Sequence, residues 1–190
     1  ENRRAKLCMD AIYRSSNYLQ SLAEEVLLIR QVEDGQFSLD SEYFPIEELI
    51  AEIINVYRTP AAEKAVQLRY LVTARQPSVK LNRLATKIIL SSLVDNSLKY
   101  GPAGQTITLS CLTAQDRIEL VVADQGPGIP EEEQERIFEP YYRSDTADEK
   151  PRGSGLGLHA VRVLARAMDG EVSLESQSGG GSRFRVKLPA

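Results

Sequence analysis

The first 34 residues have the hydrophobic spacing of one long amphipathic helix. Apolar or small residues recur in alternating steps of three and four, as they do along the seam of a coiled coil or helix bundle. These positions are Ala5, Cys8, Ile12, Ser15, Leu19, Leu22, Val26 and Ile29. Because one helix cannot bury such a stripe alone, the pattern favours a bundle, with packing on the chain's own domain as the alternative. Asp34-Gly35 ends the helix, since glycine accepts a left-handed turn.

The rest of the chain alternates between strand and helix patterns. Helices are predicted from Pro45 to about Tyr57, from Asn82 to about Tyr100, and over Leu156–Met168. Alternating apolar and polar residues predict strands. These are a strand ending at Tyr43-Phe44, and strands at Leu68–Val72, Ile107–Leu112, Ile118–Ala123, Glu171–Glu175 and Arg183–Leu188.

Residues 124–155 form a long segment rich in glycine, proline and charge, with one short helix predicted near Glu131–Ile137. Such a long loop in a compact domain is usually functional. The whole pattern predicts an α+β fold: a two-layer α/β sandwich with a mixed, mostly antiparallel sheet and helices on one face, preceded by one long bundle helix.

Composition narrows the class of protein. The 190 residues are 42% hydrophobic and 26% charged, which suits one globular domain with an appendage. A net charge of −4 gives no basic field, so we expect no nucleic-acid partner. Cys8 and Cys111 lie far apart and are expected to be reduced thiols in the cytoplasm. No apolar run reaches the ~20 residues of a membrane span. Since the chain starts at Glu1, we interpret it as part of a longer protein. Whether that longer protein is anchored in the inner membrane stays an open question.

One polar cluster ends the helix predicted to finish at Tyr100. Asn96 offers a neutral oxygen that suits a hard cation such as Mg²⁺. Lys99 is a compact positive charge that can meet phosphate oxygens, and Tyr100 is an aromatic plate that can lie against a base. Taken alone, polar residues at a helix end are more often solvated caps.

Two further clusters are rich in glycine. Residues 124–129, Asp-Gln-Gly-Pro-Gly-Ile, follow a predicted strand directly and place a carboxylate, Asp124, at its end. The glycines allow close backbone approaches, although Gly-Pro turns are common. Residues 153–158, Gly-Ser-Gly-Leu-Gly-Leu, run into a helix, where exposed backbone N–H groups and the helix dipole favour an anion. Neither a Walker loop nor a convincing dinucleotide motif is present.

The order of these clusters resembles the GHKL ATP-binding superfamily, and within it the sensor histidine kinases of two-component systems. Residues 95–100 resemble the N box, 124–128 the first glycine box, 136–143 the F box that begins the lid, and 153–158 the second glycine box. The resemblance implies an ATP-binding catalytic domain over residues 36–190. It also implies that residues 1–34 are the second helix of the dimerisation and phosphotransfer hairpin.

The resemblance assigns roles to individual residues. It implies that Asn96 ligates Mg²⁺ between the nucleotide phosphates, and that Asp124 binds the adenine amino group while Tyr100 packs on the ring. Lys99 and Arg143 would approach the phosphates, so Asn96, Lys99 and Arg143 are the implied catalytic residues. The other implied ATP-site residues are Gly126, Gly128, Ile129, Phe138, Gly153, Ser154, Gly155, Leu156, Gly157 and Leu158.

Two positions depart from the family pattern. Ser92 lies one helical turn before Asn96 and shares its face. Gyrases and chaperones of the superfamily carry a water-activating glutamate there, and histidine kinases usually carry asparagine. Because serine is a poor base without a helper, an ATP hydrolase is disfavoured. The chain's one histidine, His159, follows the second glycine box and is interpreted as a packing or capping residue rather than the phosphoacceptor.

Three hypotheses follow, in descending order of support. The first is an ATP-dependent protein-histidine kinase module whose phosphoacceptor lies upstream, with a response-regulator receiver domain as partner and a homodimer formed through the helical hairpin. The second is a nucleotide-binding pseudokinase or scaffold without an acceptor histidine. The third is a GHKL ATPase that dimerises through its lid.

Overall fold

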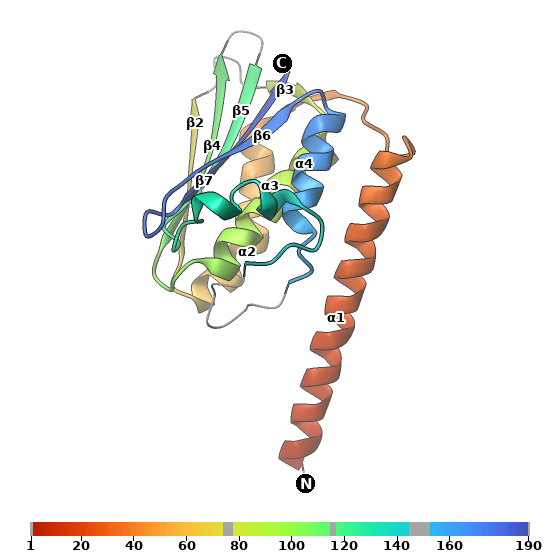
Figure 1. The fold of residues 1–190 in the computed structure, drawn as a ribbon, viewed down its shortest axis with the longest axis vertical. Helices are drawn as coiled ribbons and strands as arrows, with labels where there is room; N and C mark the ends of the chain where they lie inside the picture. The colour runs from red at the N-terminus through yellow and green to blue at the C-terminus, as the bar shows by residue number, and fades with distance from the viewer. Residues whose placement is uncertain (1, 74–77, 115–116, 145–152, 190) are drawn as a thin grey trace.

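The computed structural model describes residues 2–73, 78–114, 117–144 and 153–189, without most side chains that precede Leu22. Helix α1 (Asn2–Glu33) is long and carries the N-terminus at the end farthest from the rest of the chain (Figure 1). Its predicted end is confirmed, because Gly35 has a φ of +67° and its N–H donates to the Val32 carbonyl. None of the described helices is both long and apolar enough to cross a membrane.

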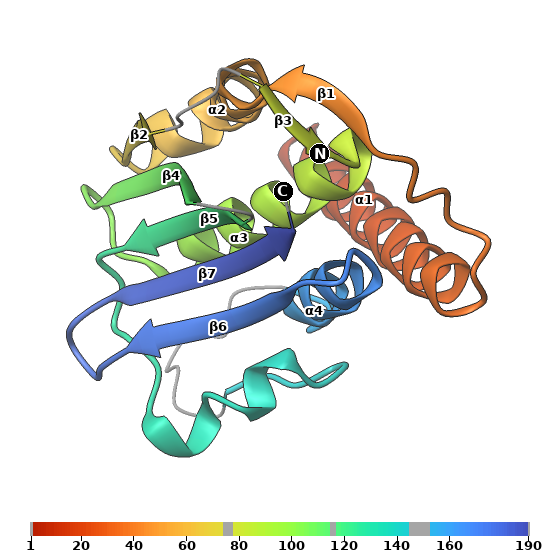
Figure 2. The ribbon, with the colours of Figure 1, turned by 90° about the horizontal axis from the view of Figure 1, so that it is seen from above.

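A five-stranded sheet forms one layer, in the order β2-β4-β5-β7-β6. β2 pairs in parallel with β4, and the remaining pairs are antiparallel. Helices α2, α3 and α4 cover one face of this sheet (Figure 2), which confirms the predicted two-layer α/β sandwich. The bounds are β2 Gln67–Thr73, β4 Thr106–Ala114, β5 Arg117–Asp124, β6 Glu171–Ser176, β7 Ser182–Pro189, α2 Ile46–Glu63, α3 Arg83–Tyr100 and α4 Gly157–Ala167.

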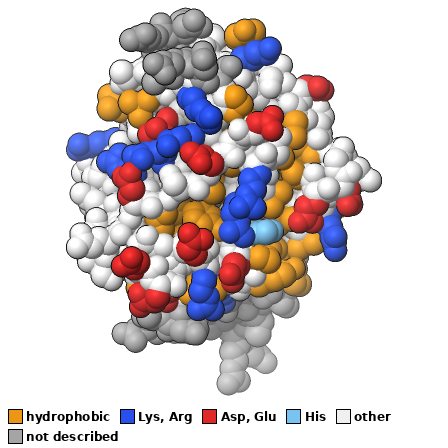
Figure 3. Space-filling model, turned by 45° about the horizontal axis from the view of Figure 1, so that its top comes forward, with side chains coloured by type: hydrophobic (Ala, Val, Ile, Leu, Met, Phe, Trp, Pro, Cys, Tyr) orange, Lys and Arg blue, Asp and Glu red, His pale blue; other side chains and the backbone are white. Residues whose placement is uncertain are grey.

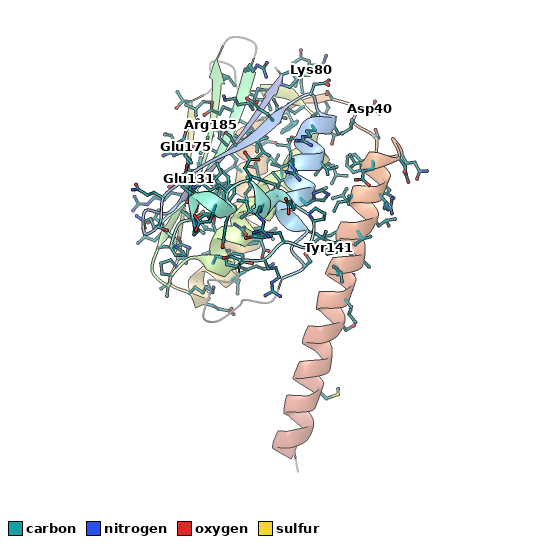
Figure 4. All side chains as sticks on the ribbon, in the orientation of Figure 1. Asp40, Lys80, Glu131, Tyr141, Glu175 and Arg185 are labelled. Atoms are coloured by element: carbon teal, nitrogen blue, oxygen red, sulfur yellow. The ribbon has the colours of Figure 1, made fainter. Side chains whose placement is uncertain are left out.

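The two faces of the sheet follow the alternation in the sequence. Ile118, Leu120 and Val122 of β5 are buried against the helices. On the opposite face, Arg185 of β7 pairs with Glu119 and Glu175 at 2.7 Å each. Arg185 and Glu175 are labelled in Figure 4. Lys and Arg side chains are likewise interspersed with Asp and Glu side chains on the face seen in Figure 3.

Helix α3 begins as its sequence predicts. The side-chain oxygen of Asn82 accepts the Ala85 N–H at 2.8 Å, and its amide nitrogen donates to the Asp40 carbonyl. The cap therefore fixes both the start of α3 and the segment that follows α1. Ile89 and Leu93 lie on the buried face of α3, so the opposite face is left to line a site.

Three local predictions need correction. Helix α2 continues past Tyr57 to Glu63 and includes Pro60. The carbonyl one turn before a proline loses its helical partner. Here that residue is Val56, which is 62% exposed and so lies on the solvent side of the helix. A second sheet pairs β1 (Glu42–Pro45) with the unpredicted β3 (Ser78–Leu81). The single helix predicted near 131–137 is two 3₁₀ turns, η1 (Glu131–Glu133) and η2 (Arg136–Phe138).

The C-terminal part of α1 packs on the sandwich. Leu22 and Ile29, two residues of the predicted seam, contact Leu156 and Ala160 near the start of α4. Leu19 is 61% exposed, so the seam continues beyond this contact. Packing on the chain's own domain therefore accounts for the last turns of α1, and a bundle remains a prediction for the rest of the stripe.

Candidate nucleotide-binding site

The predicted clusters surround one cleft of about 530 Å³, between α3, the loop after β5, the segment after η2 and the start of α4. Thirteen of the fifteen predicted site residues line it. They are Asn96, Lys99, Tyr100, Asp124, Gly126, Gly128, Ile129, Arg143, Gly153, Ser154, Gly155, Gly157 and Leu158. The predicted lid includes residues 145–152, which lie outside the described part of the chain.

At one end of the cleft, three donors hold the carboxylate of Asp124. One of its oxygens accepts the N–H groups of Gly126 at 2.9 Å and Ser182 at 3.1 Å. The other accepts the hydroxyl of Ser97 at 2.9 Å. A carboxylate offers about four acceptor positions, so one remains for a donor in the cleft. The arrangement suits recognition of an amino group.

At the other end lie the groups suited to phosphates and a cation. The Lys99 ammonium lies 2.5 Å from the Asp95 carboxylate, one turn earlier on α3. Asn96 and Ser92 line the same wall of the cleft. A Cβ built on Gly153 would lie 4.0 Å from the Lys99 nitrogen, so the second glycine cluster passes directly beside this positive charge.

Two glycines of the site are required by their surroundings. Gly128 has a φ of +74°, and a Cβ there would lie 1.9 Å from the Gln177 carbonyl oxygen. Gly155 also has a φ of +74°, and its Cβ would lie 2.8 Å from the Tyr141 carbonyl carbon. Left-handed backbone and close contact together exclude larger residues at both positions.

The two predicted site residues outside the lining are buried in apolar clusters. Phe138 packs edge-on against Phe184, with ring centroids 6.3 Å apart. Leu156 faces α1 and contacts Ile29. The Nδ1 atom of His159 lies 3.1 Å from the Phe138 carbonyl oxygen, which agrees with the packing interpretation of that histidine.

Several residues of the site escaped the sequence analysis. Glu25 of α1 lines the cleft, and its carboxylate accepts a hydrogen bond from the Ser154 hydroxyl. Ser97 was part of the N-box pattern, but nothing in the pattern indicated that it bonds Asp124. Gln105 lies next to these groups and belongs to none of the four motifs. Such contacts depend on the fold, so spacing alone could not reveal them.

Burial changes the ionisation of two groups that do not line the cleft. Burial raises the pKa of Tyr57 to about 12, with a further contribution from the negative charge of Asp95. Its hydroxyl donates to the Ser91 carbonyl at 3.0 Å. Burial also raises the pKa of the Cys111 thiol to about 12, so this cysteine stays protonated at neutral pH.

Comparison with known proteins gives the family. Residues 82–190, more than half of the chain, match the family described as histidine kinase-, DNA gyrase B- and HSP90-like ATPases. The histidine protein kinase DivJ of Caulobacter vibrioides is 34% identical over 180 residues, which are 95% of this chain and 30% of DivJ. The adaptive-response sensory kinase SasA of Synechocystis is 30% identical over 172 residues, which are 90% of this chain and 45% of SasA. The chain thus spans less than half the length of these relatives.

Solved structures resemble this chain over nearly all of its length. Full-length ShkA, in complex with AMPPNP, superposes with a TM-score of 0.86 at 26% identity, over 100% of this chain and 39% of ShkA. The histidine kinase ThkA, in complex with the response regulator TrrA, shares the fold with a TM-score of 0.75 at 21% identity, over 97% of this chain and 51% of ThkA. The chain therefore belongs to the histidine kinase-, DNA gyrase B- and HSP90-like ATPase family.

Proposed function

We propose that this chain binds ATP with Mg²⁺ and transfers the γ-phosphoryl group to a histidine outside residues 1–190. The observation that carries the proposal is the fixed carboxylate of Asp124. Its three internal donors leave about one of its four acceptor positions unused, and the residue lines the cleft, where the adenine amino group would donate. Tyr100, 41% exposed at the end of α3, can pack on the base.

The phosphates would lie toward Gly153 and the start of α4. The first backbone N–H groups of a helix lack helical partners, and the helix dipole favours an anion beside them. Lys99 lies next to Gly153, and Arg143 lines the same cleft. These groups would bind and orient the triphosphate and offset its charge.

The donor set of the described residues fits a hard cation bound together with phosphates. Asn96 supplies a neutral amide oxygen, and the Ser92 hydroxyl lies on the same wall of the cleft. When bound, Mg²⁺ would neutralise phosphate charge and fix the γ-phosphoryl geometry. Because Ser92 replaces an amide, we expect cation binding to be weaker than with two amide ligands.

In the proposed transfer, an imidazole nitrogen bonds to the γ-phosphorus while the bond from that phosphorus to the bridging oxygen breaks, and ADP leaves. His159 is not the proposed acceptor, because its ring contacts the Phe138 carbonyl. The acceptor would lie on the other helix of a dimerisation hairpin, and the phosphoryl group would then pass to an aspartate of a response-regulator receiver domain. We further propose a homodimer through that hairpin and action in the cytoplasm.

Binding of a fluorescent ATP analogue tests the first part. Asp124→Asn replaces one acceptor oxygen with a donor, and we expect it to weaken binding about tenfold or more. Asp169→Asn is the matched control, because Asp169 is exposed and far along the chain, at a φ of +56° that asparagine tolerates. Equal affinity of Asp124→Asn and the unaltered chain would overturn the adenine assignment.

The transfer itself requires the longer protein. Labelled ATP offered to a chain that includes the upstream hairpin helix should label a histidine on that helix, and omitting Mg²⁺ should abolish the label. Tight ATP binding without any labelled histidine would instead favour the pseudokinase. Label on His159 in residues 1–190 alone would contradict the proposal that the acceptor lies elsewhere.

A further inference from the structure

A buried glutamine outside the four motifs joins the two walls of the cleft at the Asp124 end. Gln105 lies in the segment between α3 and β4 and is 3% exposed. A buried side-chain amide must satisfy both its donor and its acceptor, or it destabilises the fold. Its two partners therefore indicate what the residue holds in place.

Each end of the Gln105 amide bonds a different wall of the cleft. Its nitrogen donates to the Ser97 carbonyl on α3 at 2.8 Å, and its oxygen accepts the Gln125 N–H at 3.1 Å. Ser97 donates its hydroxyl to Asp124, which directly precedes Gln125 in the chain. The contacts close a ring through Gln105, Ser97, Asp124 and Gln125.

Gly101 leaves the space that the Gln105 side chain fills. A Cβ on Gly101 would lie 1.8 Å from the Gln105 amide nitrogen. The backbone of Gly101 has a φ of −80°, which any residue adopts, so the conformation does not require glycine there. What excludes a larger residue at position 101 is the space that Gln105 occupies.

We propose that Gln105 is a positioning residue for recognition of the adenine base. It holds Ser97 at a fixed distance from the loop that carries Asp124. At that distance the Ser97 hydroxyl occupies one acceptor position of Asp124, and one further acceptor position stays available for the base. The inference rests on the proposed ATP site. Glutamine is suited to the role because it carries a donor and an acceptor at the required reach, whereas glutamate would set an oxygen against the Ser97 carbonyl.

The test compares two nucleotides that differ only in the amino group of the base. ATP and purine riboside triphosphate, which lacks that group, are titrated against Gln105→Ala. We expect the affinity for ATP to fall about tenfold and that for purine riboside triphosphate to change about twofold or less, so that discrimination between them collapses. Gln36→Ala, an exposed change of the same type, should leave both affinities unaltered. Gln105→Met keeps the volume without the hydrogen bonds, and serves if the alanine variant does not fold.

A double-variant cycle tests the fit to Gly101. Gly101→Ala should weaken ATP binding because its Cβ displaces Gln105. Adding Gln105→Ala removes the clash, so the double variant should bind ATP no worse than Gln105→Ala alone. Additive losses would contradict the proposed contact.

Two outcomes would overturn the proposal. Equal losses for both nucleotides would show that Gln105 only supports the fold, and an unaltered ATP affinity in Gln105→Ala and Gln105→Met would exclude any role. Asp124→Asn, measured in parallel, separates this from the proposed function. If Asp124→Asn weakens ATP binding and the Gln105 variants do not, only the role of Gln105 fails.

Discussion

The two ends of the cleft are built in different ways. At the end where we propose that the base binds, the base end, Asp124 is held by Gly126, Ser97 and Ser182, all within the sandwich. At the end where we propose that the phosphates bind, the phosphate end, the Ser154 hydroxyl donates to Glu25 of α1, a helix outside the sandwich. The base end should therefore keep its shape whatever α1 does. The phosphate end should depend on how α1 is placed, so a displacement of α1 would alter the site proposed for the phosphates.

The largest effect is expected from Gly128→Ala at the base end. The variant would place a Cβ 1.9 Å from a backbone oxygen at a φ of +74°, so the loop after Asp124 would have to move. We expect ATP affinity to fall more than about tenfold and the free energy of unfolding to drop by about 2–4 kcal/mol, measured by titration and urea unfolding.

Gly104→Ala is the matched control for that variant. Gly104 has a φ of +78° but nothing within 4 Å of its Cβ position, so this variant carries the backbone cost without the clash. We expect it to lower the free energy of unfolding by about 1–2 kcal/mol and to leave ATP affinity unaltered. Equal losses of ATP affinity and of unfolding free energy in Gly128→Ala and Gly104→Ala would mean that the close contact with Gln177 has no effect. The base end would then be less rigid than we infer.

Features that are local in sequence could be predicted, whereas contacts that only the fold creates could not. The four motifs are local in sequence, so their resemblance to the superfamily was enough to predict Asp124 and the glycines as site residues. The cap at Asn82 and the strand alternation of β5 were predictable for the same reason. Gln105 and Glu25 could not be found, because Gln105 bonds Gln125 and Glu25 bonds Ser154, residues that only the fold brings beside them. Strand β3 was missed because four residues carry too little periodicity.

A smaller effect is expected from Glu25→Gln at the phosphate end. The carboxylate of Glu25 lies at the cleft, where it would repel the proposed triphosphate. Removing its charge should raise ATP affinity about two- to fivefold at low salt, less at high salt, and leave adenosine affinity unaltered. Glu24→Gln, an exposed neighbour bonded to Gln20, is the control. An equal gain for adenosine would show that Glu25 acts on the shape of the cleft and not on phosphate charge.

The smallest effect at neutral pH is expected from Tyr57→Phe, which tests the wall that the two ends share. Tyr57 donates to the Ser91 carbonyl of α3, and its pKa is raised from 10.0 to about 12. A raised pKa means that the folded state favours the protonated phenol. The resulting stability is complete below pH 10 and is lost as pH rises toward 12. Tyr57→Phe should therefore flatten the fall in unfolding free energy between pH 10 and 12.

The buried Cys111 thiol, whose pKa is also raised to about 12, contributes a fall of the same sign, but it is present in both chains and cancels in their difference. ATP affinity at pH 7 should be unaltered by Tyr57→Phe, because the phenyl ring keeps the packing behind α3. Identical pH profiles for the two chains would contradict the burial of the Tyr57 hydroxyl behind α3. A loss of ATP affinity at pH 7 would instead show that this hydrogen bond sets the position of α3, and that the two ends of the cleft are coupled through their common wall.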